Sequence, residues 1–229
     1  MYSKLAAKSK FNTKCYNKRQ QPVSKITIHH MAGSMSAASC IDFWKRSGRQ
    51  VSANYVIGKD GEIVCMLEEE FRAWTSSSSW NDHRAITIEV ANSGGSPSWE
   101  VSAVVLQSLI NLCADICSRY DITPAYTGDS KGSFTFHCMY TQTECPGPYI
   151  KSNIKDILRK IKDNLSIPKD YKVKVTAKSL NIRDGAGTKY KIVGKITDQG
   201  IYTITDIQNG WGKLKSGAGW ISLKYTKEV

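Results

Sequence analysis

The sequence has no long hydrophobic run. Residues 1–10 contain no apolar stretch of signal-peptide length, and no later stretch approaches the roughly 20 apolar residues of a membrane span. We therefore expect a protein that is synthesised in the cytoplasm without a signal peptide and is not inserted in a membrane.

Cysteine is too scattered for a disulfide framework. The chain of 229 residues holds seven cysteines, an odd number in a sequence without an export signal, which indicates reduced thiols. Cys113 and Cys117 lie four apart on an apolar helical pattern, so we expect both in the core.

Acidic residues are few relative to basic ones. The chain has 32 Lys and Arg against 20 Asp and Glu, a net charge of +12, and residues 169–229 alone hold 12 basic and 5 acidic side chains, a net charge of +7. Such a positive charge favours binding to polyanions, whether nucleic acid, anionic membrane or anionic wall polymers. The alternative is that the charge only keeps the protein soluble. The basic residues are dispersed rather than striped and no nucleic-acid motif accompanies them, so we do not expect a nucleic-acid partner.

Strand and helix patterns alternate up to residue 165. Periodicity and turn residues predict a hairpin, residues 50–64, around Lys59-Asp60-Gly61, which we expect to pair with a strand at residues 25–30. A further strand is predicted at 86–90, and helices at 36–46, 102–120 and 150–165. This alternation predicts an α/β domain with a mixed central sheet flanked by helices.

The pattern changes near Pro168. Residues 171–229 contain short strand-like runs separated by Gly, Asp and Asn turns, typical of a small all-β barrel. We therefore predict an N-terminal tail at 1–22, a catalytic domain at 23–165, a linker at 166–170 and a small β domain at 171–229. The tail is basic and polar, and its sequence leaves open whether it packs on the domain or stays loose.

Histidine is the rarest informative residue type. Of four histidines, His29 and His30 end a predicted strand, and His137 lies eight positions before Cys145. Two histidines and a cysteine are the ligand set of a zinc ion with one position left open, as in catalytic sites. Successive strand residues face opposite sides, so only one of His29 and His30 can face such a site, and periodicity does not say which.

Glu89 is the best candidate for a proton acceptor beside such a metal, because it lies inside the predicted strand at 86–90. The alternative is an edge strand on which Glu89 faces solvent. A hydrolytic site also needs a group that stabilises the developing oxyanion.

Several motifs resemble, in order over residues 20–165, the type-2 family of zinc-dependent N-acetylmuramoyl-L-alanine amidases, which is related to the peptidoglycan recognition proteins. The motifs are Ile-Thr-Ile-His-His-Met at 26–31, Val-Ser-Ala-Asn-Tyr-Val-Ile at 51–57 with Lys-Asp-Gly at 59–61, Ala-Trp at 73–74, Asn-Asp-His-Arg-Ala-Ile-Thr-Ile-Glu-Val-Ala-Asn at 81–92, and His137 with Cys-Pro-Gly at 145–147.

The resemblance implies a Zn²⁺ cofactor on His29, His137 and Cys145, and hydrolysis of the amide between N-acetylmuramic acid and the L-alanine of the stem peptide. It implies a catalytic role for Glu89, which matches a glutamate carried by many members. Thr143 stands where some members have a catalytic lysine, and we expect its hydroxyl to donate a weaker hydrogen bond to the oxyanion. Ala53 and Thr75 replace a tyrosine and a histidine of other members. The expected substrate contacts are Asn54, Trp74, Asn81 and His30.

The C-terminal segment resembles a bacterial SH3 domain. The Leu-Asn-Ile-Arg run at 180–183, Gly-Ala-Gly-Thr at 185–188, and the later Trp211 and Trp220 carry this resemblance, which implies cell-wall binding. Trp211 and Trp220 could line a ligand groove, although core packing is the commoner role. The whole chain resembles a phage-type endolysin, with peptidoglycan as substrate and no protein partner implied. A bacterial autolysin or a non-catalytic peptidoglycan-binding protein is the alternative.

Overall fold

The computed structural model describes residues 1–8, 13–166, 171–208 and 210–229. The chain divides into two compact units, Met1–Lys162 and Asp163–Val229. The predicted linker at 166–170 lies, except for Ser166, outside the described residues. None of the described helices is long and apolar enough to cross a membrane.

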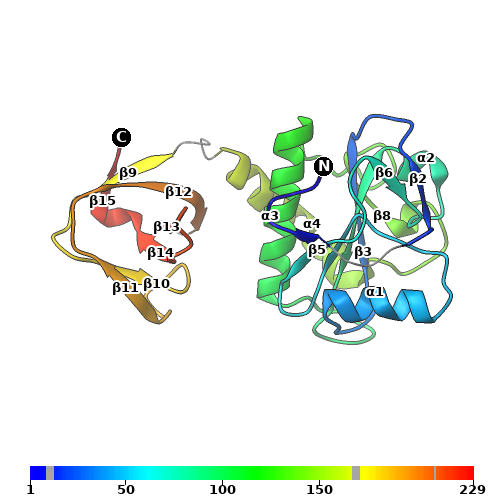
Figure 1. Ribbon diagram of the computed structural model, residues 1–229, viewed down its shortest axis with the longest axis horizontal. Helices are drawn as coiled ribbons and strands as arrows, with labels where there is room; N and C mark the ends of the chain where they lie inside the picture. The colour runs from blue at the N-terminus through cyan, green and yellow to red at the C-terminus, as the bar shows by residue number, and fades with distance from the viewer. Residues whose placement is uncertain (9–12, 167–170, 209) are drawn as a thin grey trace. The chain divides into compact units, whose positions relative to one another are not determined.

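The first unit is built on a six-stranded mixed sheet with the order β1-β5-β4-β7-β3-β8 (Figure 1). Its strands are Ala7–Lys8 (β1), Lys25–His30 (β3), Tyr55–Ile57 (β4), Ile63–Cys65 (β5), Ala85–Val90 (β7) and Phe134–Phe136 (β8). Among these described strands, only β4 and β5 pair antiparallel. The predicted α/β domain with a mixed central sheet and flanking helices is confirmed.

The prediction that the hairpin pairs directly with the strand at 25–30 is wrong. Strand β7 lies between β4 and β3 and pairs parallel with both. Every residue of β3 and of β7 is buried, as expected for the inner strands of a sheet covered on both faces. Parallel neighbours in such a sheet are joined by crossover connections, so order along the chain does not give order in the sheet.

Helices cover the sheet. Helix α1, Ala37–Arg46, begins at the N-cap Ser36, whose side chain accepts a hydrogen bond from the Ser39 N–H, and Lys45 and Arg46 in its last turn complement the helix dipole. Its buried face packs on Val56 of β4 and on Met66. The longer helices α3, Ala103–Tyr120, and α4, Gly147–Ser166, lie on the other side of the sheet in Figure 1. Cys113 and Cys117 of α3 are buried in the core, as predicted.

The described parts of the N-terminal tail pack on this unit. Strand β1 pairs parallel with β5, and β2, Tyr16–Lys18, pairs antiparallel with β6, Phe71–Ala73. The N-terminal amine forms an ion pair with Glu68 at 3.0 Å, and the Ser3 N–H donates to the Tyr55 hydroxyl at 2.7 Å. The two described parts of the tail are therefore elements of the unit.

A buried ion pair lies near the tail. Arg119 of α3 donates to both carboxylate oxygens of Glu69 at 2.6 Å, and the hydroxyl of Tyr120 donates to Glu69 at 2.8 Å. The Tyr55 hydroxyl also contacts Glu69. Because the Glu69 side chain is fully buried, these partners replace the hydration that it has lost.

In the second unit, the regular elements of the described residues are all strands apart from the end of α4 and a short 3₁₀ turn. Its seven strands follow the order β11-β10-β14-β13-β12-β9-β15, and they are Lys172–Val175 (β9), Leu180–Arg183 (β10), Ile192–Ile196 (β11), Ile201–Gln208 (β12), Trp211–Leu214 (β13), Trp220–Ser222 (β14) and Thr226–Glu228 (β15). A core of eight buried aliphatic residues, among them Val173, Ile204 and Ile221, belongs to this unit alone. The all-β prediction is confirmed, but no pairing of the described strands joins β11 to β15, so a closed barrel is not seen.

Candidate metal centre and groove

Three predicted ligands meet at the carboxyl edge of the sheet. His29 lies near the end of β3, His137 follows β8, and Cys145 lies just before α4. Because β3 and β8 are adjacent and parallel, their ends place both histidines at one edge. The candidate ligand atoms of the three residues all lie within 4.8 Å of one another.

The details of this cluster suit a metal ion. Cys145 Sγ lies 3.7 Å from His29 Nδ1, and the two imidazole rings have centroids 4.6 Å apart. Neighbouring ligand atoms of a tetrahedral zinc ion, each about 2.0–2.3 Å from the metal, lie roughly 3.5 Å apart. The Nε2 atoms of His29 and His137 are buried and have no hydrogen-bond partner within the described chain, an uncommon state for buried polar atoms.

Burial controls the protonation of the three side chains. It lowers the pKa of His29 well below its usual value, lowers that of His137, and raises the pKa of the Cys145 thiol. The histidines are therefore neutral, which is the form that binds a metal. A metal ion would displace the thiol proton of Cys145, so binding should release a proton.

His30 takes a different position from His29. Its ring packs edge-on against Trp99 with centroids 5.2 Å apart, and its backbone N–H donates to Cys145 Sγ at 3.4 Å. The strand alternation left open which histidine faces the cluster, and the structure places His29 there.

A groove of about 270 Å³ opens over the cluster. Predicted residues that line it are His29, His30, Glu89, His137, Thr143 and Cys145. Glu89 is 8% exposed, and burial raises its pKa to about 8. The Thr143 hydroxyl accepts a hydrogen bond from the Cys145 N–H at 3.2 Å. The structure thus brings the predicted ligands, Glu89 and Thr143 into one groove.

Three predicted substrate contacts lie elsewhere. Asn54 is fully buried, and its amide donates to the carbonyl oxygens of residues 67, 68 and 71. Asn81 is fully buried too, and donates to Thr27 and Ser76. Trp74 donates through Nε1 to Asn17 at 2.8 Å and does not line the groove. We correct the prediction for Asn54 and Asn81, because both side chains are fully buried and cannot be reached by a ligand. A substrate contact of Trp74, which is partly exposed, stays a prediction.

The groove has a wall that the sequence did not predict. One side of the groove is formed by α1 and the segment after it. The residues that line this side are Phe43, Trp44, Arg49, Val51 and Ser52. Phe43 is 40% exposed, and the Arg49 guanidinium carbon lies 5.3 Å from the centre of its ring. The apolar spacing of α1 does not distinguish residues that face the core from residues that face the groove. The available signal in the sequence was Phe43, an aromatic residue directly before Trp44.

The fold and the cluster define a class: an α/β protein in which two histidines and one cysteine that could hold a metal ion lie together in a groove. Residues 19–148 match the N-acetylmuramoyl-L-alanine amidase family, and the chain belongs to that family. Membership supports peptidoglycan amidase activity.

Solved structures share the fold at low identity. The Staphylococcus aureus hydrolase AmiA, in complex with its ligand, has a TM-score of 0.57 at 16% identity and covers 73% of this chain and 85% of its own. A mutant endolysin from Bacillus subtilis has a TM-score of 0.55 at 15% identity, over 70% of this chain and 99% of its own. A mutant of PlyL has a TM-score of 0.51 at 15% identity, over 63% of this chain and 87% of its own. Comparison with curated proteins gave no match.

Proposed function

We propose that the protein is a zinc-dependent amidase that hydrolyses the bond between N-acetylmuramic acid and the L-alanine of the peptidoglycan stem peptide. The observation that carries this proposal is the cluster of His29, His137 and Cys145 at the floor of a groove, in a chain of the amidase family. Zn²⁺ fits this donor set because two neutral imidazoles and one thiolate suit a borderline-soft cation and leave a fourth position for water or substrate.

In the proposed hydrolysis, the metal ion and the side chains of the protein have different roles. A zinc ion held there supplies Lewis-acid chemistry, polarising a carbonyl and lowering the pKa of water toward about 7. Glu89 supplies the proton acceptor: it lines the same groove as the ligands, where it takes a proton from the attacking water and passes it to the leaving amine. A cation nearby favours the ionised form of this carboxyl group, whose pKa is otherwise raised.

Thr143 supplies a weaker interaction. It lies on the groove two residues before Cys145, with its hydroxyl oxygen engaged by the Cys145 N–H. The hydroxyl proton can therefore point into the groove and donate to the oxyanion of the substrate. A neutral donor stabilises such a charge less than an ammonium group does.

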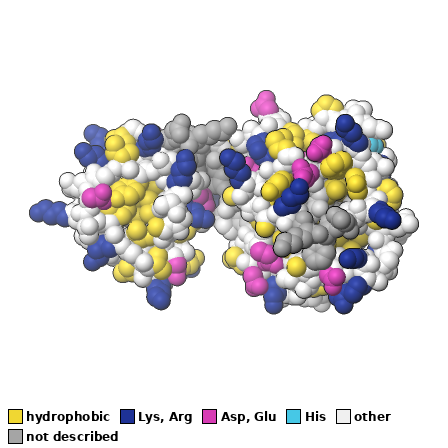
Figure 2. Space-filling view, in the orientation of Figure 1, with side chains coloured by type: hydrophobic (Ala, Val, Ile, Leu, Met, Phe, Trp, Pro, Cys, Tyr) yellow, Lys and Arg dark blue, Asp and Glu magenta, His cyan; other side chains and the backbone are white. Residues whose placement is uncertain are grey.

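The second unit is proposed to bind the cell wall as an SH3-like domain. Its antiparallel sheet, separate core and the charge of +7 on residues 169–229 support this role, and anionic wall polymers suit the charge. On the face shown in Figure 2, its apolar side chains gather with Lys and Arg side chains around them. Trp220 is buried in the unit, whereas Trp211 is partly exposed with the Arg183 guanidinium carbon 6.0 Å from its ring centre, so Trp211 is the better ligand candidate. The full chain should bind purified walls less tightly as salt is raised.

In its biological role, the protein is proposed to be a phage-type endolysin acting on the bacterial cell wall, with a bacterial autolysin of the same activity as the alternative. A non-catalytic peptidoglycan-binding protein is disfavoured, because such proteins typically lack the cysteine ligand that Cys145 provides. The activity is tested by labelling free amino groups released from purified walls. New N-terminal alanine supports the amidase, whereas new reducing sugar ends would identify a glycosidase and contradict it.

A further inference from the structure

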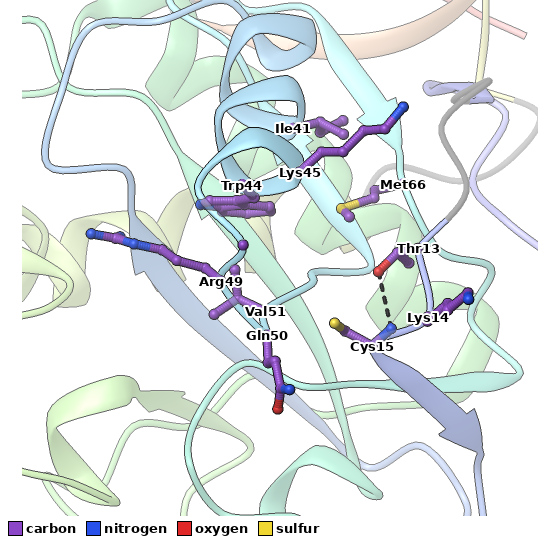
Figure 3. Close-up of a pocket in the computed structure, with 11 residues that line it drawn as sticks. Thr13, Lys14, Cys15, Ile41, Trp44, Lys45, Arg49, Gln50, Val51 and Met66 are labelled. Carbon is purple, nitrogen blue, oxygen red and sulfur yellow. Dashed lines mark hydrogen bonds between the residues drawn. The ribbon is translucent and has the colours of Figure 1, made fainter.

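A second pocket adjoins the groove. It is formed by residues 13–15 of the N-terminal segment, by one side of α1 and the turn after it, and by Met66 (Figure 3). Trp44, Arg49 and Val51 line both this pocket and the groove over the metal cluster. The two spaces therefore lie next to each other and share a wall formed by these three residues.

The pocket has an apolar floor of limited size. Ile41 and Met66 are buried, and Trp44 is half-buried beside them. In Figure 3 these three side chains gather on one side, with Thr13 and Cys15 on another. Its volume is about 210 Å³, below the roughly 300–1,000 Å³ of pockets that enclose a whole drug-sized ligand. The space suits one or two residues of a peptide rather than a disaccharide.

The rim of the pocket is basic. Lys14, Lys45 and Arg49 line it, and none of the described residues that line it is acidic. All three are exposed, and none forms an ion pair with a carboxylate in the described part of the chain. Three like charges around one small concavity raise the local concentration of anions, which include carboxylates.

We propose that this pocket is a subsite for the stem peptide beyond its L-alanine, with the apolar floor holding aliphatic parts of the peptide and the cations pairing with its carboxylates. This inference rests on the proposed function, which places the L-alanine amide over the metal cluster. Neutral sugars carry no negative charge that could form ion pairs with these cations. A long wall polymer would need an extended basic stripe rather than one pocket beside the groove.

Part of the subsite is built by residues outside the family match. That match begins at residue 19, whereas residues 13–15 form one side of the pocket. This stretch is held in place by its own contacts: the Cys15 carbonyl accepts a hydrogen bond from the Ser52 hydroxyl at 2.6 Å, and Ser52 lines the groove. The N-terminal segment would therefore contribute to peptide specificity.

The test compares two soluble substrates, muramyl peptides with two and with five stem residues. In the full chain, the double variant Lys14→Glu/Lys45→Glu should lower the ratio of kcat/KM for the long substrate to that for the short one by about tenfold, and the loss should shrink as ionic strength is raised. The control Lys155→Glu reverses an exposed lysine of α4 that lines neither pocket, and should leave the ratio unchanged. Thermal melts check that both variants are folded.

An unchanged ratio in the double variant, or an equal loss on both substrates, would overturn the subsite. Calorimetric titration with the free pentapeptide separates this result from failure of the proposed reaction. If the parent chain cleaves neither substrate but binds the pentapeptide, and the double variant does not, the subsite stands and the amidase proposal fails. If the parent chain does not bind the pentapeptide and the ratio is unchanged, the subsite is wrong.

Discussion

His29 and Glu89 are direct neighbours in the register of the parallel strands β3 and β7, and both side chains line the same groove. In adjacent strands, residues paired in register point to the same face of the sheet. The position of the proposed proton acceptor relative to a proposed metal ligand is thus fixed by backbone hydrogen bonding. A shift of one residue in the pairing register of β7 would turn the Glu89 side chain to the opposite face of the sheet.

Replacing Glu89 should reduce turnover while sparing metal binding. Glu89→Gln removes the proton acceptor but keeps the size of the side chain, so we expect kcat to fall by roughly 10²- to 10⁴-fold. Wall digestion rates and zinc content measured on the same preparation check this. Unchanged turnover would remove Glu89 from the reaction and make it a structural residue.

Replacing Cys145 should remove the metal. Cys145→Ser exchanges a thiolate for a hydroxyl that binds zinc poorly, so zinc per chain and wall hydrolysis should both fall sharply. Cys138→Ser is the matched control, because Cys138 lies in the same segment but outside the ligand cluster. The zinc model fails if the Cys145 variant retains lysis, or if both variants lose zinc equally. Wall binding by the Cys145 variant should persist.

Glu89 should also give the metal-free protein a distinctive pH dependence. Burial raises its pKa from 4.5 to about 8, so between these values the folded state holds a proton that the unfolded state has released. The contribution of Glu89 to stability is therefore present at low pH and is lost as pH rises toward 8, with a slope of up to about 1.4 kcal/mol per pH unit.

The measurement is urea unfolding between pH 5 and about 8 with a chelator present. The buried histidines titrate in the same range, but their lowered pKa values make the protein more stable as pH rises. The quantity to compare is therefore the difference in unfolding free energy between the parent chain and Glu89→Gln at each pH. The variant should become relatively more stable as pH rises. A difference that does not change with pH would show that Glu89 is not buried as a neutral acid.

Arg119→Ala should destabilise the first unit strongly. The change leaves the fully buried Glu69 without its two charged hydrogen bonds, which typically costs about 3–5 kcal/mol. Arg46→Ala, which removes an exposed pair with Asp42 on α1, should cost no more than about 1 kcal/mol. Equal losses in the two variants, measured by denaturant unfolding, would contradict the account of the Glu69 network.

The helices and the grouping of His29, His137 and Cys145 were predictable because their signals are local or chemically rare. Ser36 before an apolar repeat located α1, and the cluster was located by three of the four histidines falling in two segments, His29-His30 at the end of a strand and His137 eight residues before Cys145. The strand order was not predictable, since the pairing of β7 between β3 and β4 depends on crossover connections. Strand β8, which was not predicted from the sequence, is only three residues long, so its sequence holds little periodicity.

The predicted substrate contacts of Asn54 and Asn81 failed for a different reason. Asn54 and Asn81 are polar residues in motifs shared with the family, but polarity in a motif does not distinguish a ligand contact from a buried hydrogen-bond donor. Conversely, Phe43 has the spacing of a core residue on α1 and is 40% exposed on the groove. Only the three-dimensional arrangement separates these cases.

The central claim, zinc-dependent cleavage of the bond between N-acetylmuramic acid and L-alanine, is tested most directly by mass spectrometry of purified walls digested with the full chain, with a chelator, and with zinc restored. The account predicts stem peptides with free N-terminal L-alanine and intact glycan strands, lost on chelation and regained with zinc. Absence of these products under every metal condition, or their persistence after complete removal of metal, would contradict it.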